Sequence, residues 1–547
     1  MQRIRLVFVS LILVLSCCVA TAAPSKPNII ILLVDDMGFS DIGCYGSEIP
    51  TPNLDRLAAE GLRFTQFYNT GRCCPTRAAL LTGLYSHEAG VGHMTEDKGQ
   101  PGYRGDLNEH CVTIADVLRG AGYRTMMTGK WHVTRFVHPA SEAEKHNWPL
   151  QRGFDNYFGI IQGGANYFHP KPLTMGNQIL DELPKIEFHS AAAGALPHPA
   201  ERDGSDGFYT TDAFVDQAIT FIDAGEKQKP FFLYLAFNAP HFPLMAPQDE
   251  IAKFRGKYKI GWDKLREQRN ARQKELGVVD AAWALSPRPP RVKAWESVTA
   301  EEQDRFDQIM SIYAADVAHI DTAVGRLVAA LQQRGMLDNT LLMFLSDNGG
   351  NAESGPRGRM EGQLPGSENS TVYCGQSWAT LENTPFRRYK HFNHEGGIAT
   401  PFIVHWPKGL QSRAGVPPAP QFRTQPAHLV DLMATCVDVS GAKYPKEFQG
   451  RTILPMEGRS LLPAFADKPI KRDALYWEHE GNAAIRVDDW KLVRLGRTGA
   501  WELYNMKTDR TELHDLSAEQ PDRAKALATK WDAWATRTHV MPYPAQN

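Results

Sequence analysis

The chain has 547 residues, of which 42% are hydrophobic and 22% are charged, proportions that are typical of a globular protein with a large core. Its 60 basic and 62 acidic side chains leave a formal net charge of -2, and no long block carries a single sign. This balance argues against any partner held by a general electrostatic field, so we expect no nucleic acid and no stable membrane partner.

The first segment has the pattern of a secretory signal peptide, which we place at residues 1–22. Arg3 and Arg5 precede a short apolar run, and Ala20-Thr21-Ala22 supplies small residues for cleavage. The apolar run is too short for a comfortable membrane span. An uncleaved anchor and a lipoprotein signal ending at Cys17 are alternatives that match this pattern less well. We therefore expect a periplasmic or secreted protein.

Short apolar runs, each closed by a polar or glycine-bearing stop, predict buried strands along the chain, and helical patterns precede several of them. The predicted strands are 28–34, 123–128, 231–237, 340–345 and 402–406, and the predicted helices are 114–119, 211–223 and 300–334. Strands that alternate with helices over this length predict an α/β fold, with a large, mainly parallel sheet sandwiched by helices.

Three later segments differ in composition from this pattern. Residues 253–290 are rich in Lys, Arg and Gln, and we expect a partly helical surface insertion there. Residues 351–382 are rich in Gly, Ser and Glu, which predicts a long loop near the active face. After about Lys468, four short strand patterns joined by turns are followed by an amphipathic helix at 518–535. We expect a C-terminal subdomain at 468–547, with a small antiparallel sheet and one helix.

Oxygen-bearing side chains directly follow two of the predicted strands. Asp35 and Asp36 follow the first strand, and Asp347 and Asn348 follow the strand at 340–345. An Asp pair after one strand is more often a helix cap or a turn. Ligands of open α/β sheets, however, bind beyond the carboxyl ends of the strands, where these four side chains would meet. Oxygen ligands alone favour Ca²⁺ or Mg²⁺ over zinc, and calcium slightly over magnesium.

Cationic and titratable side chains follow two further strands, with Lys130 and His132 after one and His241 after the other. Single residues of these types are usually solvated or hydrogen-bonded structural groups. Such donors beside a metal site are, however, what an oxyanion substrate requires. Their position therefore favours catalysis on an anionic group.

The run Cys73-Cys74-Pro75-Thr76-Arg77 predicts a loop that enters a helix, with Pro75 at an allowed early position. A vicinal cysteine pair is poorly suited to disulfide geometry. A thiolate nucleophile stays open from these residues alone, because Arg77 and a helix N-terminus would lower the pKa of a thiol. The other cysteines of the mature chain show no zinc-type spacing, and their pairing also stays open.

This run resembles the signature of the type I sulfatases, Cys-x-Pro-Ser/Thr-Arg followed by Thr-Gly. The order of the other motifs agrees: Asp-Asp after the first strand, Gly-Lys-x-His, a His after a strand, Asp-Asn-Gly-Gly, and Lys390 before Glu395-Gly396-Gly397. Over residues 26–547 the chain resembles formylglycine-dependent sulfatases of the alkaline phosphatase superfamily, and bacterial arylsulfatases most closely. The resemblance implies a catalytic sulfatase domain at 26–467.

The resemblance also implies the roles of the site residues in the hydrolysis of a small-molecule or glycan sulfate ester. A formylglycine-generating enzyme would convert Cys73 to formylglycine, whose hydrate is the nucleophile and which Arg77 steadies. The side chains that would hold one divalent cation, calcium in preference to magnesium, are Asp35, Asp36, residue 73, Asp347 and Asn348. Lys130, His241 and Lys390 would bind the sulfate group. Either His241 or Lys390 would protonate the leaving oxygen, and His132 would take a proton from the second hydroxyl.

Two other functions stay open at this stage. A phosphate or phosphonate ester hydrolase could use the same formylglycine site, because sulfate and phosphate are both tetrahedral. A non-catalytic binder of sulfated glycans could keep the fold, although every expected catalytic position is filled. The sequence does not rank aryl, glycan and alkyl sulfates as substrates, and it leaves the oligomeric state open.

Overall fold

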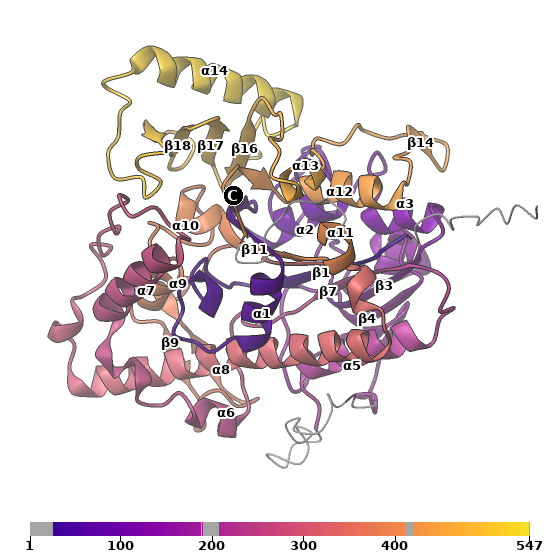
Figure 1. The fold of residues 1–547 in the computed structure, drawn as a ribbon, viewed down its shortest axis with the longest axis horizontal. Helices are drawn as coiled ribbons and strands as arrows, with labels where there is room; N and C mark the ends of the chain where they lie inside the picture. Colours follow the sequence, from indigo (N-terminus) through magenta and orange to yellow (C-terminus); the bar gives the residue numbers. More distant parts are fainter. Residues whose placement is uncertain (1–25, 187–188, 190–206, 412–420, 546–547) are drawn as a thin grey trace, which may run out of the picture.

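The computed structural model describes residues 26–186, 189, 207–411 and 421–545 (Figure 1). The signal peptide predicted at 1–22 lies outside these ranges. Among the residues described, no helix is both long enough and apolar enough to cross a membrane. All six cysteines of these ranges are buried, and none of them takes part in a disulfide.

A sheet of eleven strands forms the centre of the molecule. Its five middle strands run parallel, in the order β8 (Thr340–Ser346), β1 (Asn28–Val34), β7 (Phe231–Ala236), β3 (Arg124–Lys130) and β4 (Asn156–Ile160). Most of their residues are buried, as continuous apolar runs require when helices cover both faces of a sheet. The predicted α/β fold with a large, mainly parallel sheet is therefore confirmed.

Both margins of this sheet contain antiparallel strands. On one side β11 (Ala399–His405) is antiparallel to β8 and to β2 (Leu62–Tyr68), which also pairs with β12 (Gln421–Arg423) and β13 (Ala427–His428). On the other side β5 (Leu173–Met175) and β6 (Gln178–Leu180) extend from β4. Because β11 is antiparallel to both β2 and β8, these two strands run in the same direction and end at the same edge of the sheet.

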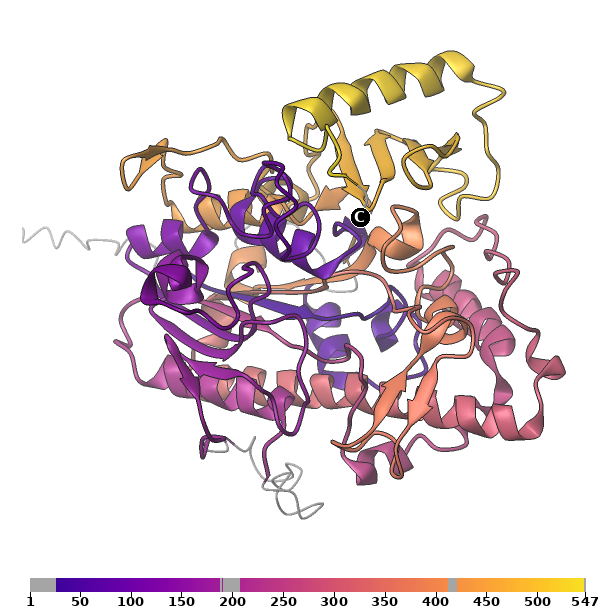
Figure 2. The ribbon, with the colours of Figure 1, turned by 180° about the vertical axis from the view of Figure 1, so that it is seen from behind.

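Helices cover the two faces of the sheet, as Figures 1 and 2 show. One face packs against α1 (Pro52–Glu60), α5 (Thr210–Asp223) and α8 (Ala300–Gln333), and the other against α2 (Cys73–Thr82), α3 (Ile114–Gly120) and α12 (Asp431–Ser440). Alternate residues of β1 divide between the two cores, with Ile30 and Leu32 in the first and Ile29 and Ile31 in the second. This period of two is the geometry of a strand buried on both sides.

The C-terminal residues form the predicted small antiparallel sheet covered by one helix. The sheet comprises β16 (Leu475–His479), β17 (Asn482–Val487), β18 (Trp490–Arg494) and β19 (Trp501–Asn505). Helix α14 (Pro521–Arg537) lies over it at the top of Figure 1 and buries Trp531 and Trp534 against it. This part of the predicted architecture is confirmed.

A buried ion cluster joins this small sheet to the body of the molecule. Lys491 Nζ lies 2.8 Å from Glu395 Oε1 and 2.8 Å from Glu512 Oε1, and Arg510 Nε lies 2.7 Å from Glu395 Oε2. All four side chains are fully buried. Ions taken out of water need such partners, so the cluster fixes the small sheet against the segment that contains Glu395.

The prediction of a long loop at 351–382 is only partly right, because residues 351–358 and 362–370 are irregular but most of the rest is not. This segment contains β9 (Arg359–Glu361), β10 (Thr371–Tyr373) and α9 (Gly375–Glu382). Among its apolar side chains, Val372, Trp378 and Leu381 are fully buried and anchor β10 and α9 despite the polar composition.

The segment 253–290 is partly helical as predicted, through α7 (Trp262–Leu276). It is not only a surface insertion, because Arg269 of α7 is buried, with its Nη1 2.6 Å from Asp41 Oδ1.

Short elements complete the described chain. They are α6 (Gln248–Ala252), α10 (Glu395–Ile398), α11 (Pro407–Gln411), α13 (Leu462–Phe465), β14 (Glu447–Phe448), β15 (Arg451–Thr452) and 3-10 turns at Gly43–Tyr45, Glu142–Asn147, Pro149–Arg152, Lys257–Ile260, Trp295–Ser297 and Leu337–Asn339.

Candidate active site

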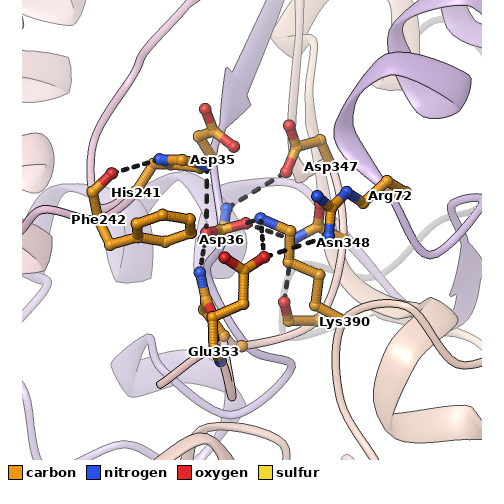
Figure 3. Close-up of polar contacts among 12 residues, drawn as sticks. Asp35, Asp36, Arg72, His241, Phe242, Asp347, Asn348, Glu353 and Lys390 are labelled. Carbon is orange, nitrogen blue, oxygen red and sulfur yellow. Dashed lines mark hydrogen bonds and ion pairs between the residues drawn. The ribbon is translucent and has the colours of Figure 1, made fainter. Parts of the chain in front are cut away.

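The register of the parallel strands brings the predicted site residues to one edge of the sheet. Val34 of β1 pairs with Ser346 of β8, so the residues that follow, Asp35 and Asp347, emerge side by side. Strands β7 and β3 end beside them and deliver His241 and Lys130. Strand β2 ends at the same edge, and α2 then begins at Cys73. Figure 3 shows the carboxylates and part of this convergence.

Four oxygen-bearing side chains form the floor of the site. The backbone N–H of Asp36 donates to Asp347 Oδ1 over 3.2 Å, and Asn348 Nδ2 donates to Asp36 Oδ1 over 2.7 Å. Asp35 Oδ1 and Asn348 Oδ1 are buried and make no hydrogen bond. Buried oxygens without a donor are rare and call for a positively charged or donating partner. The donor set therefore fits a divalent cation with oxygen ligands.

Three cationic side chains are paired with the three carboxylates of the site. Lys130 Nζ lies 2.5 Å from Asp35 Oδ2, and Lys390 Nζ lies 2.6 Å from Asp36 Oδ1. Arg77 Nη2 lies 2.8 Å from Asp347 Oδ2, and its Nη1 donates to the carbonyl of Lys130 over 2.9 Å. All these side chains are buried, so the charges act in a medium that screens them little.

The carboxylates experience different electrostatic environments. Burial alone raises the pKa of Asp36, but the positive charge of Lys390 and the hydrogen bonds from Lys390 and Asn348 outweigh it and hold that pKa below its usual range. Burial and the negative charge of Asp35 raise the pKa of Asp347 well above its usual range, although Arg77 lies beside it. A further positive charge next to Asp35 and Asp347 would therefore be stabilised at this point.

The start of α2 places a pair of buried cysteines beside His132. Donor atoms of Cys73, Cys74 and His132 lie within 4.8 Å of one another, and His132 Nε2 is 3.1 Å from Cys74 Sγ. A hydrogen bond from Cys74 and the positive charge of Lys130 lower the pKa of the Cys73 thiol well below its usual range. They outweigh burial, which acts in the opposite direction. Burial raises the pKa of the Cys74 thiol. Only the first cysteine of the pair is therefore placed to act as an anion.

Both histidines of the site are neutral at neutral pH. Burial lowers the pKa of His132 to about 4, and it also lowers the pKa of His241. His241 Nδ1 donates to the carbonyl of Phe242 over 2.6 Å, and its Nε2 lies 3.7 Å from Asp36 Oδ2. Because Nδ1 is committed to a carbonyl, only Nε2 of His241 can exchange a proton with a ligand.

Close backbone contacts explain how Lys390 reaches the site. A Cβ on Gly349 would lie 1.9 Å from the carbonyl oxygen of Gly396, so only glycine fits there. The Gly349 N–H donates to the carbonyl of Gly397 over 3.0 Å, and the Lys390 N–H to that of Gly350 over 3.2 Å. These contacts hold the Lys390 segment on the residues that follow β8.

Two site residues adopt left-handed backbone conformations that side chains other than glycine rarely take. Asp36 has φ 67° and His132 has φ 56°. Such conformations cluster at functional sites, where the surrounding structure maintains them. Both side chains are thereby directed into the site.

Other residues contact the site that the sequence did not predict. Asn351 Nδ2 donates to Asp36 Oδ2 over 2.7 Å. Glu353 Oε1 lies 3.2 Å from Arg72 Nη1 and 4.0 Å from Lys390 Nζ, and Phe242 lies under the ammonium of Lys390 (Figure 3). Arg72 and Phe242 are sequence neighbours of predicted site residues, and Asn351 and Glu353 lie in the segment expected near the active face. These positions were the only features of the sequence that could have pointed to them.

Comparison with known proteins gives matches over nearly the whole chain. The family model described as Sulfatase matches residues 27–442, and the one described as N-sulphoglucosamine sulphohydrolase, C-terminal, matches residues 387–530. An uncharacterized sulfatase of Schizosaccharomyces pombe is 33% identical over 96% of each chain. An arylsulfatase of Klebsiella aerogenes is 34% identical over 80% of this chain and 92% of its own.

Solved structures agree with these matches. The crystal structure of Ps i-CgsB in complex with k-i-k-neocarrahexaose has a TM-score of 0.65 and 27% sequence identity, and the likeness covers 93% of each chain. One family model spans more than half of this chain, and two relatives above 30% identity cover most of it. The chain therefore belongs to the sulfatase family, and hydrolysis of sulfate esters is the activity that this membership supports.

Proposed function

We propose that this sulfatase uses a formylglycine nucleophile made from Cys73, together with one calcium ion. The observation that carries the proposal is the position of Cys73 at the start of α2, where its thiol faces Lys130 and His132 beside three buried carboxylates. Membership of the sulfatase family supplies the reaction type. When present, formylglycine supplies, as its hydrate, the hydroxyl that attacks sulfur in a covalent mechanism.

The cation would be held by Asp35, Asp36, Asp347 and Asn348, with residue 73 as the remaining ligand. Two of these side chains have buried oxygens that accept no hydrogen bond. Calcium accepts six to eight oxygen ligands in flexible geometry, whereas magnesium demands a tighter octahedron, so this carboxylate-rich set favours calcium. The ion would supply Lewis acidity to the oxygens of the sulfate group.

The remaining side chains of the site would bind the sulfate group or transfer protons. Lys130 and Lys390 place ammonium groups where charge on the non-bridging sulfate oxygens needs compensation. His241 presents Nε2 to the same region, and a bound sulfate group would raise the pKa of this imidazole and favour protonation of Nε2. Either that Nε2–H or Lys390 then protonates the leaving oxygen. His132, which is neutral, can accept a proton from a hydroxyl at position 73. Arg77 steadies that residue through its contacts with Asp347 and the carbonyl of Lys130.

We further propose that the substrate is a small-molecule or glycan sulfate ester and that the protein is secreted or periplasmic. One relative is an arylsulfatase, and the solved structure of Ps i-CgsB holds a k-i-k-neocarrahexaose, so both substrate types occur among similar proteins. The signal pattern at 1–22 supports export. A formylglycine-generating enzyme would be the partner during maturation.

The proposal is tested by comparing turnover of 4-nitrophenyl sulfate with that of 4-nitrophenyl phosphate in one preparation. The chain should be produced with a formylglycine-generating enzyme, stripped with a chelator, and resupplied with calcium or magnesium. We expect sulfate turnover that disappears with the chelator and returns best with calcium. Turnover of the phosphate alone would overturn the assignment as a sulfatase, and activity indifferent to metal removal would overturn the metal site.

A further inference from the structure

A second cluster of metal-ligating side chains lies between the body of the molecule and the C-terminal sheet. His479 ends β16, Glu480 follows it in the turn to β17, and His391 lies in the loop before α10. One donor atom from each of the three lies within 4.8 Å of the others. His93 borders the group, with its Nε2 3.5 Å from Glu480 Oε1. Three imidazoles therefore surround one carboxylate.

His479 is the most informative member of this cluster. Its side chain is completely buried, yet neither ring nitrogen makes a hydrogen bond, and its Nε2 lies 3.6 Å from Glu480 Oε1. A buried imidazole in a folded protein normally has a partner for at least one nitrogen. The ring is thus directed at the centre of the cluster with a free nitrogen.

His391 has the surroundings that are usual for a metal ligand. Its Nδ1 lies 2.9 Å from Glu480 Oε2, while Nε2 lies 3.2 Å from Glu353 Oε1. Metal-binding histidines commonly donate their second ring N–H to a carboxylate in this way. Arg72 also contacts the His391 ring, but its charge is offset because it forms an ion pair with Glu353.

The backbone at the cluster adopts costly conformations. His391 has φ 81° and Glu480 has φ 53°, both in the left-handed region that favours glycine. Both residues direct their side chains into the same cluster. The surrounding structure therefore maintains these backbone conformations.

A cavity gives solvent access to the cluster. Its volume is about 440 Å³, and His93 and Glu480 are among the residues that line it, together with Tyr103 and Arg497. An ion can therefore reach the cluster from outside, which a metal site requires.

We propose that His391, His479 and Glu480, with His93 as a fourth ligand, form a second metal site that binds a zinc-type ion. Imidazole nitrogens with one carboxylate are ligands that zinc favours, whereas the all-oxygen set at the active site suits calcium. Ligands from three separate segments would be tied together by one ion. Because His391 follows Lys390 in sequence, the ion would also anchor the segment that delivers Lys390.

The test measures bound zinc on the full chain, with calcium present throughout so that the oxygen site is saturated. A Cys73→Ala background removes one thiol from the Cys73, Cys74 and His132 group, which could otherwise bind zinc. We expect one tightly bound zinc per chain after gel filtration, and a higher unfolding temperature with zinc than without it.

Glu480→Gln is the principal variant in this test, because Glu480 is exposed and the substitution keeps its shape. Altering groups around a metal ligand costs about 10- to 100-fold in affinity, so loss of a ligand should weaken zinc binding at least about 100-fold. His391→Gln should do the same, and His169→Gln, outside the cluster, should bind as the parent does. Zinc bound equally by parent and Glu480→Gln, or no zinc retained by a folded parent, would overturn the site. Neither readout depends on sulfatase activity.

Discussion

Replacing Lys390 with methionine removes one buried positive charge from the site and keeps most of the side-chain volume. The ammonium lies 2.6 Å from Asp36 Oδ1 and 5.3 Å from the ring centre of Phe242, and the side chain is 1% exposed. Methionine can fill the same space against Phe242, so the change isolates the charge from the packing.

Two effects of this substitution should be measurable. If the ammonium compensates charge that develops on the sulfate group, kcat should fall about 10²- to 10³-fold, which corresponds to about 2.7–4 kcal/mol. Breaking a buried ion pair costs about 3–5 kcal/mol of stability. We expect about 3 kcal/mol in metal-free protein, because Asp36 keeps its hydrogen bonds from Asn348 and Asn351. A cation bound to Asp36 should reduce that loss.

The same substitution should change the acid stability of the metal-free protein. Lys390 helps to hold the pKa of Asp36 below its unfolded value, so this carboxylate stabilises the fold above the unfolded pKa. That contribution is lost as the pH falls through the folded pKa. Without Lys390 the folded pKa rises towards the unfolded one, so the variant should lose less stability than the parent as the pH falls below the unfolded pKa.

The assays are steady-state kinetics with an aryl sulfate at saturating calcium and urea unfolding with and without chelator. Lys408→Met is the control, because Lys408 is exposed and its loss should change stability by no more than about 0.5 kcal/mol. A Lys390→Met enzyme that keeps kcat within about threefold of the parent would refute the placement of this ammonium beside the sulfate group, because that change is under 1 kcal/mol.

Three further predictions concern other parts of the molecule. Burial penalises the charged form of His132 and lowers its pKa to about 4, so the fold should lose stability as the pH falls from 6.5 to 4, where only the unfolded chain takes up this proton. His132→Gln should flatten that slope in unfolding curves and lower kcat about 10²-fold or more. Lys491→Met should cost about 3–5 kcal/mol in thermal unfolding, because it leaves Glu395 and Glu512 buried without this cation, and an unchanged unfolding temperature would contradict the buried cluster. Mass spectrometry of the peptide that contains Cys73 should show loss of its thiol in active preparations, and activity from an unmodified Cys73 would contradict the formylglycine nucleophile.

The middle of the sheet could be predicted because its strands are continuous apolar runs. Strands β1, β7 and β8 have this character, and few other structures can bury so many branched side chains in succession. Strand β2 was not predicted, because Arg63, Thr65 and Gln66 interrupt its apolar pattern. Those polar residues are accommodated by tertiary contacts, such as the bond from Arg63 Nη1 to the carbonyl of Cys44 over 2.8 Å.

The positions of the site residues followed from strand ends, whereas their pairings did not. A rule about the carboxyl edge of a parallel sheet was sufficient to bring Asp35, Asp347 and Lys130 together. The pairing of each cationic side chain with a particular carboxylate depends on the register of the strands and on how far each side chain extends. Neither can be read from a local stretch of sequence. Asn351 illustrates this limit, because it contacts Asp36 from a segment whose structure was expected to be irregular.

The ion cluster around Glu395 has a consequence for how this protein can evolve and be engineered. Glu395 belongs to the Glu-Gly-Gly segment that positions Lys390, while its partners Lys491 and Arg510 belong to the C-terminal part. A recombination event could replace residues 468–547 with a segment that lacks cations at positions 491 and 510. The carboxylate of Glu395 would then be buried without an ion-pair partner. The two family matches overlap between residues 387 and 442, the stretch that contains Glu395. Crossover points for functional chimeras should therefore fall before this stretch, so that both halves of the cluster are inherited together.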